Sequence, residues 1–158
     1  MTRAALLLLP LLLVSACGGP VQIDAGDLSD ADAKACAAFV DELPETLDDL
    51  DRVDVQPAGA PGAAYGDPAI VITCGVGQPD GYHAGASCES VAGVDWFVPD
   101  GEYTDHAIDV TLTSAWSRPR VEVQIPKDYW PEATAAATGV LSPIVEKHME
   151  TVGHCQRL

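Results

Sequence analysis

The chain has 158 residues, of which 24 are acidic and only 8 are Lys or Arg, so its formal net charge at pH 7 is −16. A surface of this charge repels the phosphates of nucleic acids and anionic lipid headgroups, and we therefore exclude nucleic acid as a partner. The length is typical of one domain with a substantial core.

The N-terminus carries an export signal. Residues 4–16 form an almost wholly aliphatic run that ends at Cys17. Because a membrane-spanning helix needs about 20 apolar residues and this run has about a dozen, we expect residues 1–16 to be a signal peptide that is removed. Residues 14–16 (Val-Ser-Ala) before the cysteine resemble the lipobox of bacterial lipoproteins. This resemblance implies that Cys17 is lipidated, with acyl chains such as palmitate. The alternatives are ordinary signal-peptide cleavage and a short uncleaved anchor.

The expected mature chain would run from residue 17 to residue 158, which is 142 residues, and loss of Arg3 would change its charge from −16 to −17. Residues 17–28 begin with Gly-Gly-Pro and are predicted to form a flexible, lipid-anchored tether. Residues 29–158 are predicted to form a single globular domain on the extracytoplasmic face of the cell membrane.

The remaining cysteines are Cys36, Cys74, Cys88 and Cys155. An even number of cysteines in an exported domain predicts disulfides, here two. In one arrangement, Cys74–Cys88 closes a local loop and Cys36–Cys155 joins two residues that are far apart in the sequence. Another, Cys36–Cys74 with Cys88–Cys155, fastens the first helix to a central strand, and the residues alone leave both open. The cysteine spacing does not suit zinc.

The first half of the domain is predicted to contain one helix and one buried strand. Ser29, with Asp32 three residues later, resembles a capping box, and Pro44 ends the helix. Its apolar face comprises Cys36, Phe39, Val40 and Leu43. Val53 and Val55 indicate a short edge strand, and residues 57–68 are predicted to form a loop. Residues 69–74 form a continuous apolar run that predicts a central strand.

The second half alternates in the manner of an antiparallel sheet. Residues 75–92 are predicted to form a loop and are followed by a strand at 94–98. Residues 108–114 and 121–125 alternate apolar and polar side chains and predict a hairpin through a turn at 117–119. A last helix begins at Pro131, with a kink or break expected near Ser142 because of Gly139 and Pro143. Its predicted apolar stripe is Ala136, Val140, Leu141, Ile144, Val145 and His148. The fold class is therefore α+β: a two-layer sandwich with a mostly antiparallel sheet of about four to five strands and both terminal helices on one face.

Several short motifs follow one another along the chain. They are Leu43-Pro44 after a cysteine-containing helix, Tyr65-Gly66-Asp67-Pro68-Ala69-Ile70-Val71, Cys74-Gly75-Val76, Gly93-Val94-Asp95-Trp96 and Ser117-Arg118-Pro119. Over about residues 36–150 they resemble the actinobacterial exported proteins of the domain of unknown function 3515 family. The family usually has Trp where this chain has Tyr65. The resemblance implies the pairing Cys36–Cys74, with Cys88–Cys155 as the second disulfide, and it implies no activity.

Five residues are candidate ligand contacts. Arg118 and Arg120 are the densest basic pair in an acidic chain, and guanidinium groups suit bidentate contact with a carboxylate or phosphate, although pairing with nearby acids is the alternative. Trp96 alternates with two valines and is predicted to lie in the core, whereas the alternative is an aromatic platform beside Asp95. Asp67 lies in a predicted turn.

The chain contains no serine-hydrolase elbow, zinc-protease motif, phosphate-binding loop or dinucleotide fingerprint. We therefore expect no cofactor, no metal site and no catalytic residues. The leading hypothesis is a non-enzymatic, lipid-anchored protein that binds an envelope protein or cell-wall component. The alternative is a small envelope hydrolase or ligand-binding enzyme with a site near Asp67, Asp95 and Arg118. A substrate-binding component of an importer ranks last, because the chain is short for a two-lobed protein.

Overall fold

The computed structural model describes residues 19–155, except residues 84, 87 and 106. The predicted signal peptide and Cys17 lie outside the described residues. Within the described part of the chain, no helix is both long and apolar enough to cross a membrane.

The strands and helices of the described residues are distributed along the whole described part of the chain. The strands are β1 (Val21–Gln22), β2 (Thr46–Leu47), β3 (Leu50–Val53), β4 (Val55–Gln56), β5 (Gly62–Tyr65), β6 (Ile70–Val76), β7 (Cys88–Val91), β8 (Val94–Phe97), β9 (Val110–Thr113), β10 (Ser117–Arg118), β11 (Arg120–Ile125) and β12 (Glu150–Thr151). The helices are α1 (Asp30–Asp41), α2 (Asp100–Thr104), the 3-10 helix η1 (Lys127–Tyr129) and α3 (Glu132–His148).

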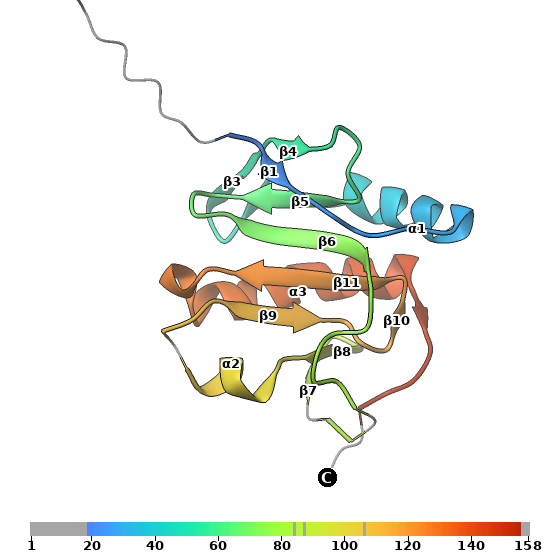
Figure 1. Ribbon diagram of the computed structural model, residues 1–158, viewed down its shortest axis with the longest axis vertical. Helices are drawn as coiled ribbons and strands as arrows, with labels where there is room; N and C mark the ends of the chain where they lie inside the picture. Colours follow the sequence, from blue (N-terminus) through green and yellow to red (C-terminus); the bar gives the residue numbers. More distant parts are fainter. Residues whose placement is uncertain (1–18, 84, 87, 106, 156–158) are drawn as a thin grey trace, which may run out of the picture.

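The main sheet is antiparallel throughout, with the strand order β2-β3-β5-β6-β11-β9-β8-β7. Helices α1 and α3 contact each other and lie side by side behind the sheet (Figure 1). Two small ribbons flank it: β1 pairs with β4 in parallel, and β10 pairs with β12 in antiparallel orientation. The predicted α+β class with a mostly antiparallel sheet is confirmed.

The predicted sheet of four to five strands is wrong, because the main sheet has eight strands. Strand β5 lies in the expected loop 57–68, and all four of its residues are buried. A Cβ on Gly62 would lie 2.1 Å from the carbonyl oxygen of Ile72, so glycine permits β5 to lie this close to β6. Strand β7 lies in the expected loop 75–92 and forms the sheet edge. In β5, Gly and Ala, which are depleted in strands, therefore build part of the sheet.

Other expected elements match the structure closely. Ser29 caps α1, because its hydroxyl oxygen accepts a hydrogen bond from the Asp32 N–H at 3.2 Å. Strand β6 is central, between β5 and β11. The predicted hairpin is formed by β9 and β11, in which Val123 pairs with Leu112. The turn predicted at 117–119 instead contains β10.

Helix α3 differs from its prediction in two respects. It continues through Pro143 to His148, so of the kink or break expected near Ser142 the break is absent from this described helix. Its buried face is also rotated from the predicted stripe, because Val140 is 40% exposed whereas Thr138 and Ser142 are buried. Its buried residues are Ala133, Ala137, Thr138, Leu141, Ser142 and Val145. Hydroxyls lie inside here because each donates a hydrogen bond to a backbone carbonyl one turn earlier.

Trp96 lies in the core, as its alternation with valines predicted, and is fully buried on β8. Its indole N–H donates a hydrogen bond of 2.9 Å to the hydroxyl oxygen of Ser142 on α3. A buried indole requires such an acceptor, because an unpaired N–H inside a protein costs about 1–3 kcal/mol. The pair Trp96–Ser142 therefore fixes the register of α3 against the sheet.

The two main helices are also joined at their C-terminal ends. Glu42, which follows α1, accepts a hydrogen bond from Lys147 and lies 3.0 Å from His148 Nε2. The bond from Lys147 is the main reason that the pKa of Glu42 lies below its ordinary value. Because the side chains of Lys147 and Glu42 are exposed, their ion pair contributes little to stability.

The substitution Ser142→Ala should lower the free energy of unfolding by about 1–3 kcal/mol, because it leaves the Trp96 N–H buried without its acceptor. Urea denaturation measures the loss. In a Trp96→Phe background the same substitution should cost at least about 1 kcal/mol less. Equal losses in the two backgrounds would show that the Trp96–Ser142 hydrogen bond does not stabilise the fold.

Candidate anion-binding site

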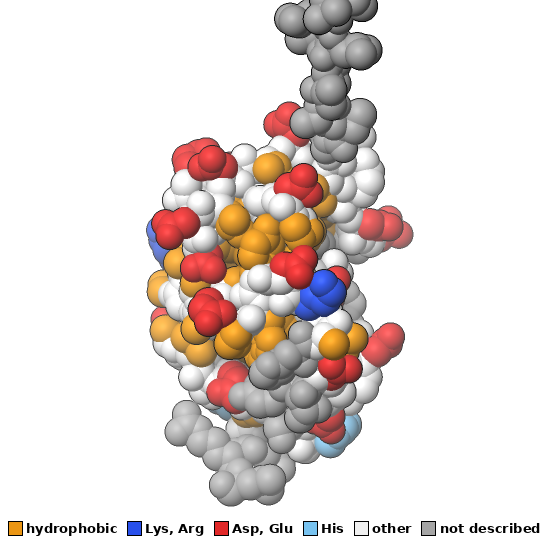
Figure 2. Space-filling model, turned by 90° about the vertical axis from the view of Figure 1, so that its left-hand side faces the viewer, with side chains coloured by type: hydrophobic (Ala, Val, Ile, Leu, Met, Phe, Trp, Pro, Cys, Tyr) orange, Lys and Arg blue, Asp and Glu red, His pale blue; other side chains and the backbone are white. Residues whose placement is uncertain are grey.

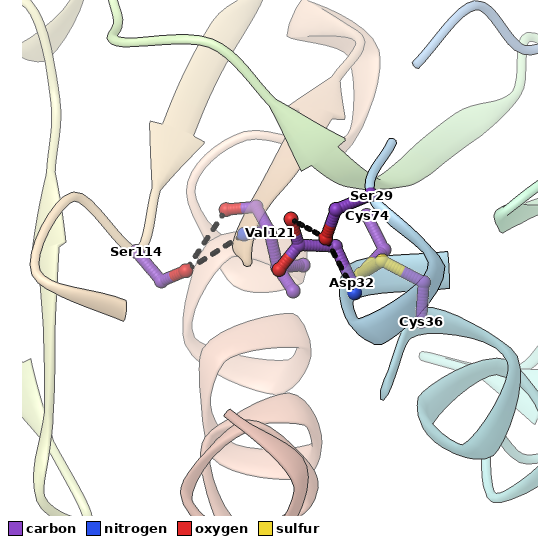
Figure 3. The surroundings of a disulfide bond; sticks show 6 residues. All are labelled: Ser29, Asp32, Cys36, Cys74, Ser114 and Val121. Atoms are coloured by element: carbon purple, nitrogen blue, oxygen red, sulfur yellow. Dashed lines mark hydrogen bonds between the residues drawn. A yellow bond between two sulfur atoms is a disulfide. The ribbon is translucent and has the colours of Figure 1, made fainter. Parts of the chain in front are cut away.

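The start of α1 is held close to the end of β6 by a disulfide. Cys36 on α1 and Cys74 on β6 are both fully buried, and their Cα atoms lie 5.6 Å apart (Figure 3). The second disulfide, Cys88–Cys155, joins the edge strand β7 to the chain after β12. These are the pairs that the family resemblance implies, not the arrangement with a local loop.

The segment before α1 packs against the same end of β6. Leu28 lies so close to Gly75 that a Cβ there would be 2.2 Å from its Cδ2 atom. Gly75 has a φ of +89°, a conformation that other residues rarely adopt. Upstream, Ile23 and Ala25 are buried and Val21 pairs with Val55, so residues 21–28 lie along the domain. This segment belongs to the stretch for which a flexible tether was expected.

Arg118 and Arg120 are brought together by one backbone carbonyl. The oxygen of Ala115 accepts a hydrogen bond of 3.0 Å from Arg118 Nη1 and one of 3.1 Å from Arg120 Nε. Arg118 Nη1 also donates to the oxygen of Ser117 at 2.6 Å. A guanidinium has five N–H donors, so most donors of both side chains remain available.

The two arginines line a hollow of ≈ 360 Å³. Its lining residues are Gly26, Asp27, Leu28, Asp32, Gly75, Val76, Gly77, Arg118, Pro119 and Arg120, and we call it the arginine hollow. Among the described residues, no carboxylate lies within 4.0 Å of either guanidinium. Burial chiefly, and then the positive charge of Arg118, lower the pKa of Arg120 from its ordinary value. Two partly buried cations therefore face a hollow without a compensating ion pair.

The other candidate contacts lie elsewhere. Asp67 is exposed in the turn between β5 and β6, at the opposite end of β6 from Arg120, which pairs with Val76. At about 3.3 Å per residue, the seven residues of β6 separate the two ends by about 20 Å. Trp96 is fully buried and offers no exposed platform. The structure thus does not gather Asp67, Asp95 and Arg118 into one site.

Asp95 is the centre of a small polar cluster. Its carboxylate accepts hydrogen bonds from the Ser90 hydroxyl and, at 2.8 Å, from the Cys155 N–H, and it lies 3.6 Å from His154 Nδ1. A serine-hydrolase triad places the histidine between the serine and the acid. Here the carboxylate occupies the middle position, so the imidazole is not arranged to take the proton of Ser90. The cluster joins the C-terminal segment to β8.

A second hollow, of ≈ 330 Å³, lies between strands β7 to β9 and the first turns of α3. Its walls are mainly apolar, and they include Val98, Val110 and Trp130. Glu89 is its one charged lining residue. This hollow would suit an aliphatic group, but it lacks the converging polar groups that orient a specific ligand.

The rest of the acidic charge is dispersed. On the face shown in Figure 2, acidic side chains are spread around the apolar ones and basic side chains are few. Within the described residues, no group of three or more His, Cys, Asp and Glu side chains is placed to hold a metal ion. Among the described residues, the arginine hollow differs from this dispersed acidic surface because two basic side chains line it.

Sequence reasoning identified Arg118 and Arg120 but missed the rest of the hollow. Asp27, Asp32 and Gly75 approach the arginines only through tertiary contacts, about 90 positions away in the sequence for Asp27. The implied disulfide Cys36–Cys74 was the one feature of the sequence that could have predicted this approach, because it brings the beginning of α1 to the end of β6.

Comparison with curated proteins and with solved structures finds no match. A family model does match, over residues 3–153 of the chain, and its description is a protein of unknown function. Since the match covers nearly the whole sequence, the chain belongs to the DUF3515 family.

Proposed function

We propose that this chain is an exported lipoprotein, attached through Cys17 to the extracytoplasmic face of the cell membrane. Its domain is a non-enzymatic binding module that takes an anionic group of an envelope component, a carboxylate or a phosphate, in the arginine hollow. The observation that carries the binding role is the pair Arg118 and Arg120, which line a hollow without an ion pair among the described residues.

The electrostatics support an anionic ligand. Two neighbouring guanidiniums repel each other, and their partial burial removes part of the hydration that would offset this repulsion. An anion bound between them would relieve both effects. Guanidinium donors also match the oxygen spacing of carboxylates and phosphates, which allows bidentate hydrogen bonds.

The anchoring role rests on the sequence around Cys17 and on the two disulfides. Disulfides persist in oxidising compartments outside the cytosol, and this chain has two. The alternative role, a small hydrolase, has no support from the polar cluster at Asp95, whose carboxylate separates the serine from the histidine.

The double substitution Arg118→Gln/Arg120→Gln should weaken binding of N-acetyl-alanyl-alanine, a peptide with one carboxylate, at least ten-fold. Hydrogen bonds to charged groups contribute about 1.5–3 kcal/mol each, which is about ten-fold or more in affinity. NMR titration of the amides of Gly75 and Gly77, which line the hollow, measures the dissociation constant.

Arg52→Gln is the matched control, because Arg52 lies on β3, outside the residues that line the arginine hollow. It removes one positive charge from the chain and should leave the titration unchanged. Equal weakening by Arg52→Gln, or no change at the amides of Gly75 and Gly77 in the unsubstituted protein, would refute the proposed site.

The substitution Cys17→Ala should abolish incorporation of labelled palmitate in growing cells, because the proposed lipid attachment needs this thiol. Labelled protein on a denaturing gel gives the readout. The variant Cys88→Ala/Cys155→Ala removes two other cysteines, which form a disulfide, and should still be labelled. Labelling of Cys17→Ala at the level of the unsubstituted chain would overturn the proposed anchor.

A further inference from the structure

We infer that the ligand of the arginine hollow is zwitterionic, with an ammonium group as well as the anionic group. This inference rests on the proposed function and narrows its ligand class. The hollow is lined by two carboxylates, Asp27 and Asp32, in addition to Arg118 and Arg120. Ligands of this kind include a free dipeptide and a phosphoethanolamine headgroup.

The acidic and basic parts of the hollow come from different segments. Arg118 and Arg120 belong to β10 and β11, whereas Asp27 precedes α1 and Asp32 lies in its first turn. The two carboxylates remain more than 4.0 Å from the guanidiniums, since no ion pair among the described residues joins them. Opposite charges thus line one hollow without neutralising each other by contact.

The fold sets the positions of three of these four side chains. Arg118 and Arg120 are held by the carbonyl of Ala115, and Asp32 accepts a hydrogen bond of 2.8 Å from the Ser29 hydroxyl. The Asp27 side chain is exposed, and its backbone is placed by the neighbouring Leu28, which lies in close contact with Gly75. A charge arrangement that is held by the fold can be complementary to a ligand before the ligand binds.

The charges select against ligands of one sign. A purely anionic ligand meets the carboxylates of Asp27 and Asp32, and a purely cationic ligand meets the guanidiniums of Arg118 and Arg120. A ligand with both groups pairs each of its charges with the opposite sign, whereas repulsion weakens the binding of ligands with one charge. The formal charges of the four side chains sum to zero, in a chain whose net charge is −16.

The volume of the hollow limits the ligand size. At ≈ 360 Å³ it lies near the lower end of small-molecule sites, which measure about 300–1,000 Å³. It would accommodate one dipeptide or one headgroup rather than an extended chain. We therefore expect recognition of a free dipeptide or of one headgroup of a larger envelope component.

Calorimetric titration of the folded protein with four probes tests this inference. The probes are alanyl-alanine, with both charges, N-acetyl-alanyl-alanine, with the carboxylate alone, alanyl-alanine amide, with the ammonium alone, and glycerophosphoethanolamine, with a phosphodiester and an ammonium. We expect a zwitterionic probe to bind at least ten-fold more tightly than either singly charged peptide. The tighter of the two zwitterions identifies whether the source is a free dipeptide or a headgroup.

Charge-removing variants provide the second arm. Asp27→Asn should weaken binding of the preferred zwitterion and strengthen binding of N-acetyl-alanyl-alanine, because it removes both an ammonium partner and a source of repulsion. Asp30→Asn is the matched control, since Asp30 lies in the same part of the chain but not among the residues that line the hollow. It should leave both affinities unchanged.

The outcomes separate this inference from the proposed function. If N-acetyl-alanyl-alanine binds as tightly as both zwitterions and Asp27→Asn changes nothing, the zwitterionic ligand is refuted while the anion site stands. If no probe binds, or if Arg118→Gln/Arg120→Gln leaves all affinities unchanged, the anion site itself is refuted. Preferential binding of alanyl-alanine amide would refute both.

Discussion

The covalent link between Cys36 and Cys74 is the constraint on which the rest of this arrangement depends. It holds α1 against the central strand β6, and both sulfurs are buried in the core. Because α1 starts only two helical turns before Cys36, its first residues and the segment before it must lie near the end of β6. That placement brings Asp27 and Asp32 to the hollow whose other side chains are Arg118 and Arg120. A crosslink between a helix and a strand thus positions charges from distant parts of the sequence.

Buried polar contacts position further elements in addition to those joined by the Cys36–Cys74 disulfide. The hydrogen bond from Trp96 to Ser142 sets the rotation of α3, and it explains why a serine rather than Val140 faces the sheet. The carboxylate of Asp95 likewise holds the last described residues through the Cys155 N–H. In each case a polar side chain lies inside because a specific partner is present, which is the usual condition for burying such groups.

Patterns local in the sequence predicted much of the fold, and tertiary effects account for the rest. Alternation predicted β9 and β11, and an apolar run predicted β6, since one or both faces of these strands are buried. Strand β5 escaped prediction because its Gly and Ala residues satisfy close packing against β6 rather than a strand pattern. The arginine pair was visible because its members are two positions apart, whereas Asp27 and Asp32 reach it only through the folded chain.

The pairing of β1 with β4 has a consequence for where the domain works. If Cys17 carries lipid, the chain is fastened to the domain again at Val21, at the end of the molecule where β1 and β4 lie (Figure 1). The four residues from 17 to 20 reach at most about 14 Å at about 3.3–3.6 Å each. The domain would then stay close to the membrane surface, in a thin layer of the envelope beside the bilayer. It could bind only those components that extend into that layer.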